Sequence, residues 1–459
     1  MRTSVVVIGG GQAGLAMSWW LTRRGVDHVV LERGAVAHSW RTRRWDSLRL
    51  LTPNWMSRLP GHGYDSEDHA GYRRAGEVVD MLDAYAGSFG APVRPHTTVV
   101  GLAPDPSGFR VDTDDGSWRC RAVVVATGTE GEATVPALAK DLPGHLHQIT
   151  ALRYREPGQV ALGDVLVVGA SASGVQIADE LRRAGRRVSV AVGDHVRVPR
   201  TYRGRDIYHW MNALGILDER YDEVEDLARA RRLPSLQLAG TPQRRTLDLA
   251  SLSTAGVELT GRFVGVARGR AQFSGSLANL IKAADLKQAR LLDRVDAHID
   301  EHDLGDRVEL AERPSPTPLP AVVTEQELAG FSAVVWATGH RPRYSWLDPA
   351  LLDHRGAIRH DGGVLEVPGM YVLGLPFTRR RGSNLLAGVG SDARVLCDHL
   401  VQQLGLRHAP GTLGYAYRRS DNIAAARAAP SVSTGRLSTV RSISVEIASA
   451  STSGSRTSA

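Results

Sequence analysis

The chain has 459 residues, 42% of them apolar and 23% charged, with a formal net charge of +7 and two cysteines. This length allows two or three domains, and the two distant thiols exclude a disulfide scaffold, a cysteine zinc site and a Cys-x-x-Cys redox pair. No apolar run approaches the ~20 residues of a membrane helix, and the arginines are dispersed instead of forming a nucleic-acid-binding block. We therefore expect a cytoplasmic protein without nucleic-acid partners or membrane insertion, whose positive charge steers anionic ligands inward.

The N-terminal stretch predicts a nucleotide-binding βαβ unit. The apolar run at residues 5–8 is typical of a buried parallel strand, and Gly9, Gly11 and Gly14 follow it with the spacing Gly-x-Gly-x-x-Gly. In this pattern the first glycine permits a tight turn, the second lets backbone approach a pyrophosphate, and the third brings helix close to strand. Glu32 ends a second strand, where a carboxylate accepts hydrogen bonds from ribose hydroxyls. A glycine-rich turn that binds nothing is the disfavoured alternative, because strand, helix and acid are all in place.

The region up to residue 128 predicts a ligand-covering loop, a helix and several strands. Residues 37–55 are dense in aromatic, arginine and proline residues with weak periodicity, which favours a loop folded over a ligand. A tryptophan-anchored structural loop is the alternative. Residues 75–90 have helical spacing, and residues 97–126 alternate as strands before Thr127 and Gly128.

Residues 165–192 repeat the opening unit. The same register holds for three glycine pairs, Gly9 with Gly169, Gly14 with Gly174, and Gly25 with Gly185. Ser171 replaces the middle glycine and is small enough to allow close backbone approach. Two such units in one chain are far less probable by chance than one, so the repeat predicts two dinucleotide-binding folds.

The two units differ at the end of their second strands. Val192 occupies the position of Glu32, and four arginines surround it, namely Arg186, Arg187, Arg197 and Arg200. A carboxylate would repel a 2′-phosphate, whereas arginine can pair with one. We therefore predict FAD in the first unit and NADPH in the second, with Arg197 and Arg200 as contacts of the 2′-phosphate. Asp194 lies close by in sequence and leaves NADH open.

Residues 203–300 predict a mainly helical insert without a chemical motif. Helical spacing covers residues 208–217, 221–231 and 277–299, and a short β pair is expected from residues 257–259 and 263–266. The proline-rich residues 313–320 predict a surface turn.

The C-terminal region predicts a return to the first domain. Residues 332–339 echo the earlier strand that ends in Ala-Thr-Gly, so we expect them to join the first sheet. A short strand follows at residues 372–374, and a helix over residues 388–404 places Asp392 near its N-terminus, facing a cofactor. Beyond Ala429 the Ser/Thr/Ala-rich composition predicts disorder.

These residues resemble the two-dinucleotide-fold flavoproteins, specifically flavin-containing monooxygenases, their plant YUCCA-type relatives and bacterial flavoprotein oxidoreductases. The resemblance covers residues 3–405, and its most specific parts are residues 9–32, 40–60, 169–174 and 337–342. It implies FAD in the first unit, NADPH in the second, and Trp40 near the flavin. Leu51 stands where amine-oxidising members place an asparagine, which leaves the substrate open.

The resemblance also implies the chemistry. NADPH would reduce FAD, and a flavin hydroperoxide formed with O₂ would oxygenate a small organic substrate. Thr52 and Asn54 are the catalytic hypotheses, as loop groups that hydrogen-bond the oxygenated flavin or the nicotinamide. Capping of the loop is the alternative role. An NAD(P)H-dependent flavin reductase without oxygenation and a flavin-binding regulatory or transport-associated protein stay open, as does a homodimer, and no metal site is predicted.

The predicted fold class is α/β, with two Rossmann-like domains, the second inserted in the first. The FAD domain comprises residues 1–155 and 326–408, the NAD(P)H domain residues 156–325, and the C-terminal segment residues 409–459. The predicted cofactor-binding residues lie in the glycine loops, at strand ends or at helix N-termini: Gly9, Gly11, Gly14, Glu32, Trp40, Thr127, Gly128, Gly169, Ser171, Gly174, Arg197, Arg200, Gly339 and Asp392.

Overall fold

A computed structural model describes residues 1–405. The predicted disorder beyond Ala429 lies outside the described residues. Within residues 1–405, no helix combines the length and apolarity needed to cross a bilayer.

The first sheet is wholly parallel, with the strand order β22-β7-β1-β2-β3. Its strands are β1 (Val5–Ile8), β2 (His28–Leu31), β3 (Val93–Arg94), β7 (Ala122–Val125) and β22 (Met370–Val372). Strands β1, β2 and β7 are completely buried, as their runs of β-branched residues predict.

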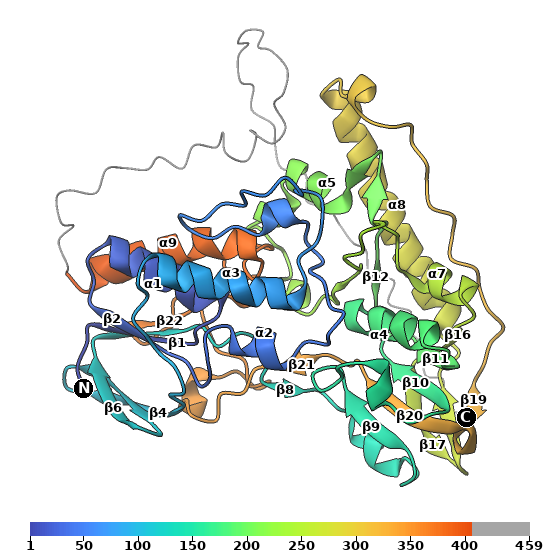
Figure 1. Ribbon diagram of the computed structural model, residues 1–459, viewed down its shortest axis with the longest axis horizontal. Coiled ribbons are helices and arrows are strands. Elements are labelled where there is room, and N and C mark those ends of the chain that lie inside the picture. The colour runs from blue at the N-terminus through green and yellow to red at the C-terminus, as the bar shows by residue number, and fades with distance from the viewer. Residues whose placement is uncertain (406–459) are drawn as a thin grey trace, which may run out of the picture. The chain divides into compact units, whose positions relative to one another are not determined.

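Both faces of the first sheet are covered. Helices α1 (Gln12–Arg23), α3 (Ala75–Ser88) and α9 (Leu386–Gln403) pack on one face through an apolar cluster that includes Leu15, Leu82 and Leu396 (Figure 1). An antiparallel meander of β4 (Val99–Asp105), β5 (Gly108–Thr113) and β6 (Gly116–Cys120) covers the other face, where Val111 and Trp118 pack on the sheet.

The second sheet repeats this plan, with the strand order β16-β11-β10-β20-β9. Its strands are β9 (His147–Thr150), β10 (Asp164–Val168), β11 (Val188–Ala191), β16 (Glu258–Thr260) and β20 (Phe331–Trp336). Helices α4 (Ala172–Arg183) and α7 (Leu249–Thr254) belong to its core, and β17 (Phe263–Ala267), β18 (Arg270–Phe273) and β19 (Glu325–Glu327) form a three-stranded antiparallel sheet. The repeat predicted from the glycines therefore extends to five parallel strands and a small antiparallel sheet, and the α/β fold with two dinucleotide-binding units is confirmed.

Two predictions about strand pairing are wrong. Residues 332–339 do not join the first sheet, because β20 pairs with β10 and β9 in the second. Its Ala-Thr-Gly ending is the counterpart of the one after β7, and the chain returns to the first sheet only at β22. The expected β pair also fails, since β16 pairs with β11 and β17 pairs with β18.

The helical insert contains α5 (Ile207–Ala213), α6 (Leu227–Ala230) and the long α8 (Leu277–Glu301). The helix predicted over residues 221–231 is confined to α6, whereas the one predicted over residues 277–299 is confirmed. Helices α5 and α8 share an apolar cluster with Met56, and Leu385 packs against that cluster, so the insert contacts loops of the first unit.

The remaining α-helix and strands are short, namely α2 (His38–Thr42), β8 (Glu132–Ala133), β12 (Val196–Arg197), β13 (Thr201–Tyr202), β14 (Arg205–Asp206), β15 (Leu236–Gln237) and β21 (His340–Arg341). Strands β8 and β21 pair with each other in antiparallel fashion. Strand β8 lies where the chain leaves the first sheet for the second, and β21 lies where the chain returns from the second sheet to the first.

Candidate cofactor sites

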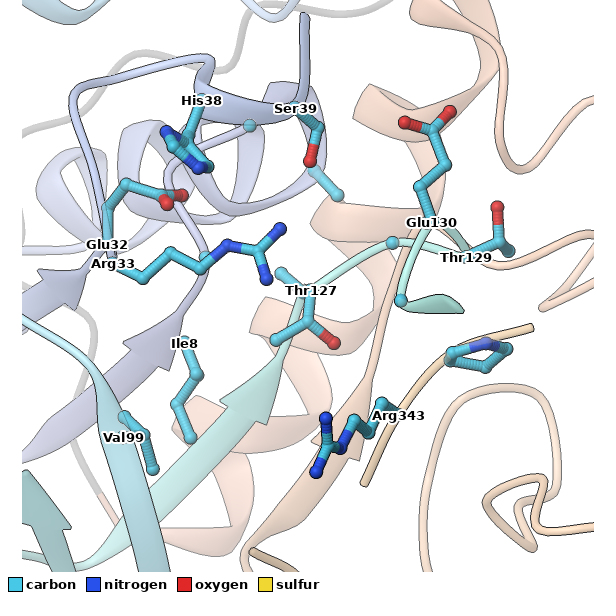
Figure 2. Close-up of a pocket in the computed structure, with 18 of the residues that line it drawn as sticks. Ile8, Glu32, Arg33, His38, Ser39, Val99, Thr127, Thr129, Glu130 and Arg343 are labelled. Carbon is cyan, nitrogen blue, oxygen red and sulfur yellow. The ribbon is translucent and has the colours of Figure 1, made fainter. Parts of the chain in front are cut away.

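A cavity of about 640 Å³ lies at the carboxyl ends of β1, β2 and β7. Parallel α/β sheets bind ligands at this edge. Glu32, Arg33 and His38 lie on one side of the cavity, and Thr127 and Glu130 lie on the other (Figure 2).

The first glycine loop has the backbone geometry that its spacing predicts. A Cβ on Gly9, whose φ is +113°, would lie 2.5 Å from the Ala126 carbonyl oxygen, and one on Gly14 would lie 1.8 Å from the Gly9 carbonyl oxygen. Only glycine at these two positions therefore lets the helix pack this closely against the strand. A Cβ on Gly11 would have no neighbour within 4 Å, because Gly11 faces the cavity at the N-terminus of α1. The loop therefore leaves room for backbone N–H groups to meet a pyrophosphate.

Glu32 is buried at the edge of the cavity and is fixed by backbone donors. Its Oε2 accepts a hydrogen bond from the Gly10 N–H at 2.6 Å, and its Oε1 accepts one from the Gly34 N–H at 3.2 Å. A carboxylate offers about four acceptor sites, so the group retains capacity for ribose hydroxyls.

Cations and Trp40 line the rest of this cavity. Trp40 Nε1 donates to Gln12 Oε1 at 3.2 Å, and the Arg44 guanidinium lies 4.5 Å from the centre of the Trp40 ring. Burial, followed by the charge of Arg33, lowers the pKa of both Arg43 and His38. Such concentration of positive charge favours an anionic ligand, and this cavity has the cradle, the acid and the charge that FAD requires.

The second cradle reproduces the backbone geometry of the first. A Cβ on Gly169, whose φ is +110°, would lie 2.4 Å from the Ala337 carbonyl oxygen, and one on Gly174 would lie 1.9 Å from the Gly169 carbonyl oxygen. Ser171 occupies the N-cap position of α4, as Gly11 occupies that of α1. Gly339, with φ +85°, follows β20 as Gly128, with φ +68°, follows β7.

The predicted role of Arg197 and Arg200 is wrong, because both side chains are buried in ion pairs. Arg197 pairs with Asp248 and Asp285, each at 2.8 Å. Arg200, with 0% exposure, pairs with Asp206 at 2.6 Å. Guanidiniums neutralised in this way are not available to a 2′-phosphate.

The arginines before β11 cannot serve either, because they lie at the opposite end of the strand from the ligand edge. Arg186 donates to the Ala161 and Val160 carbonyl oxygens, and Arg187 pairs with Asp164 at 3.6 Å.

Arg262 is a candidate that sequence reasoning missed. It follows β16, whose carboxyl end adjoins that of β11, and its guanidinium lies 3.2 Å from the Asp194 carboxylate. Its side chain is 52% exposed, and its Nη1 would lie 3.6 Å from a Cβ on Gly193, the residue after Val192, which is the counterpart of Glu32. Only the pairing of β16 with β11 brings this arginine to the cofactor edge, so no local pattern could have found it.

Thr52 and Asn54 are buried and do not line the first cavity. Asn54 Nδ2 donates to the Asp68 carbonyl oxygen at 2.9 Å, while its Oδ1 has no partner within residues 1–405. The hydrogen bond from the Asn54 side-chain amide fits the loop-capping alternative. A catalytic role for Thr52 or Asn54 stays a prediction.

The predicted position of Asp392 at a helix N-terminus is wrong, because α9 already begins at Leu386. Its carboxylate is completely buried and accepts a hydrogen bond from Arg380 Nε at 3.0 Å, and burial raises its pKa. Asn384, just before α9, lines the cavity instead, and its carbonyl oxygen accepts a hydrogen bond from Gln12 Nε2 at 2.9 Å.

Comparisons with known proteins agree with this architecture. The family model for pyridine nucleotide-disulphide oxidoreductases matches residues 6–203. An uncharacterized CzcO-like oxidoreductase of Geobacillus kaustophilus is 32% identical over 400 residues, which are 86% of this chain and 98% of that protein. The indole-3-pyruvate monooxygenase YUCCA4 of Oryza sativa subsp. japonica is 27% identical over 91% of this chain and 90% of its own length. The solved flavin-containing monooxygenase from Stenotrophomonas maltophilia shares the fold, with a TM-score of 0.62 at 23% identity, over 88% of this chain and 99% of its own.

Proposed function

This chain belongs to the flavin-containing monooxygenase family and is an oxidoreductase, and we propose that it uses FAD, NADPH and O₂ to oxygenate a small organic substrate. The observation that carries the proposal is the cavity at the edge of the first sheet, where an open glycine, a fixed carboxylate and several guanidiniums meet. A second cradle of the same geometry supports a second dinucleotide.

Each group has a task in this proposal. Gly11 and the N-terminus of α1 hold the FAD pyrophosphate, and Glu32 orients the adenosine ribose. The Trp40 ring, held by Gln12 and covered by Arg44, restricts water beside the cavity. Gly169, Ser171 and the N-terminus of α4 hold the nicotinamide dinucleotide. When bound, FAD supplies the hydride acceptor and the reaction with oxygen.

The activity can be tested on the purified protein with FAD. We expect a yellow protein that oxidises NADPH with uptake of O₂, and that transfers an atom of ¹⁸O₂ into a product when a substrate panel is screened. NADPH oxidation that needs only an added electron acceptor, with no oxygen incorporated, would favour the reductase. Bound FAD without oxidation of NADPH or NADH would favour a regulatory protein, and a colourless protein that refuses FAD would overturn every one of these functions.

The choice of NADPH over NADH can be tested at Arg262. We expect Arg262→Ala to weaken NADP⁺ binding about tenfold and to leave NAD⁺ binding unchanged, because an exposed charge-assisted bond to a phosphate is worth about 1.5 kcal/mol. Equilibrium titration of the FAD-loaded protein with both dinucleotides measures this. Arg290→Ala, on the exposed side of α8, removes the same charge as a control. Equal losses for the two dinucleotides would contradict a 2′-phosphate contact.

A further inference from the structure

A second cavity, also of about 640 Å³, adjoins the first. His38, Arg43, Gly131 and Arg343 line both cavities, so the two are neighbours that share part of their walls. The rest of its wall comes from Thr42, from β8 and the nearby Val135, and from the end of β9 with the segment that follows it, namely Thr150, Leu152, Arg153 and Arg155. Neither glycine cradle contributes to this wall.

The second cavity concentrates positive charge. Four guanidiniums line it, those of Arg43, Arg153, Arg155 and Arg343, against the single carboxylate of Glu132. Glu132 already pairs with Arg343 at 3.2 Å. Arg155 satisfies one nitrogen with the Arg44 carbonyl oxygen at 3.0 Å, and Arg43 bonds the Gly131 carbonyl oxygen at 2.8 Å. Carbonyl partners satisfy donors without neutralising charge, so the cavity retains an excess of cations.

Arg153 is the cation best placed to take a ligand. Its side chain is exposed, and within residues 1–405 its guanidinium has neither a hydrogen bond nor an ion pair. Its backbone is nevertheless fixed, because its N–H donates to the Thr150 carbonyl oxygen at 2.9 Å and its own carbonyl accepts from Gln159 at 3.3 Å. The next residue, Tyr154, is completely buried. The guanidinium is therefore presented from a rigid segment instead of a loose loop.

We propose that the second cavity binds the carboxylate of a small organic acid, the compound to be oxygenated, through the Arg153 guanidinium. This deepens the proposed function and rests on it. Val135 and Leu152 give the cavity apolar wall beside the cations, which suits an acid with an apolar body. The planar guanidinium fork matches a carboxylate in bidentate geometry. The dinucleotide phosphates have their own glycine cradles, so they do not account for these arginines.

The test is equilibrium binding of benzoate and of its neutral isostere, benzamide, to the FAD-loaded protein at low salt, followed by calorimetry and by the flavin absorption spectrum. We expect benzoate to bind at least tenfold more tightly than benzamide. Arg153→Gln should remove most of that difference without changing benzamide affinity, and Arg153→Lys should retain part of it. The matched control is Arg187→Gln, which removes an equal charge at a side chain that is 84% exposed and does not line the cavity.

Three outcomes would overturn the proposal. Equal affinities for benzoate and benzamide would show that the cavity does not select a carboxylate. Equal losses of benzoate affinity in Arg153→Gln and Arg187→Gln would show that the effect comes from the net charge of the protein. Weaker NADP⁺ binding in Arg153→Gln, with benzoate unaffected, would assign the cavity to dinucleotide phosphate. Because the titration needs no turnover, benzoate selection without oxygen transfer would refute only the oxygenation, and oxygen transfer without such selection would refute only the carboxylate site.

Discussion

Gly14→Ala should destabilise the protein by about 3 kcal/mol, at the upper end of the range for overpacked cores, and should abolish FAD binding. The added Cβ would lie 1.8 Å from the Gly9 carbonyl oxygen, which belongs to the rigid loop and cannot retreat. Helix α1 would have to move away from β1 and carry the phosphate-facing N–H groups with it. Denaturant unfolding followed by circular dichroism, together with flavin absorbance after gel filtration, measures both effects.

Gly11→Ala is the matched variant, because it adds the same methyl group in open space. No atom lies within 4 Å of its Cβ position, and its φ of −89° suits alanine. We expect a stability loss below about 1 kcal/mol, the usual effect at a helix N-cap. FAD affinity should nevertheless fall roughly ten- to hundredfold, since the methyl occupies the approach of the pyrophosphate. Unimpaired FAD binding by Gly11→Ala would contradict the assignment of this cavity.

Arg200→Met should destabilise the protein by about 3–5 kcal/mol, because it leaves the largely buried Asp206 carboxylate without its cationic partner. Arg200 is completely buried, pairs with Asp206 at 2.6 Å and donates to the Leu51 carbonyl oxygen at 2.8 Å. Its guanidinium also lies 5.0 Å from the centre of the Tyr72 ring. Any loss of dinucleotide binding should be equal for NADPH and NADH, since the defect is structural. Thermal and denaturant unfolding, with titration of both dinucleotides, checks this.

The control for Arg200 is an exposed ion pair of the same type. Arg220 and Asp222 pair with side chains that are 52% and 43% exposed, and Arg220→Met should change stability by no more than about 1 kcal/mol. Adding Asp206→Asn to Arg200→Met should recover part of the loss, because it removes the stranded charge. A selective loss of NADPH binding in Arg200→Met would restore the phosphate role that burial excludes here.

The two glycine cradles were predictable from the sequence because each is encoded by neighbouring residues. The spacing of Gly9, Gly11 and Gly14 determines the turn, the open approach and the close packing, and the structure has all three. The repeat at Gly169 was equally local. Glu32 was found because a strand end lies at a fixed distance from the loop it serves.

Pairings between distant segments were not predictable in the same way. Arg197 lies far in sequence from its partner Asp248, and nothing near it marks it as neutralised. Strand β20 is followed by the same Ala-Thr-Gly sequence as β7, whose sheet it was expected to join. It pairs instead with β10 of the second sheet, and the Ala337 backbone that follows it lies against Gly169. Equivalent endings cannot specify which sheet receives them. Arg262 was missed for the same reason, since tertiary pairing alone brings it beside Asp194.

The β8–β21 pair limits the rotation of the first sheet relative to the second. Within residues 1–405 the chain passes from the first sheet to the second at β8 and returns at β21, and these passages are hydrogen-bonded side by side. Rotation of one sheet against the other would twist this two-stranded ribbon and would move Arg200 relative to the Leu51 carbonyl oxygen to which it donates a hydrogen bond. Glu132 and Ala133 of β8 also line the second cavity. A molecule bound there would therefore restrict the twisting of the β8–β21 pair on which rotation of the two sheets depends.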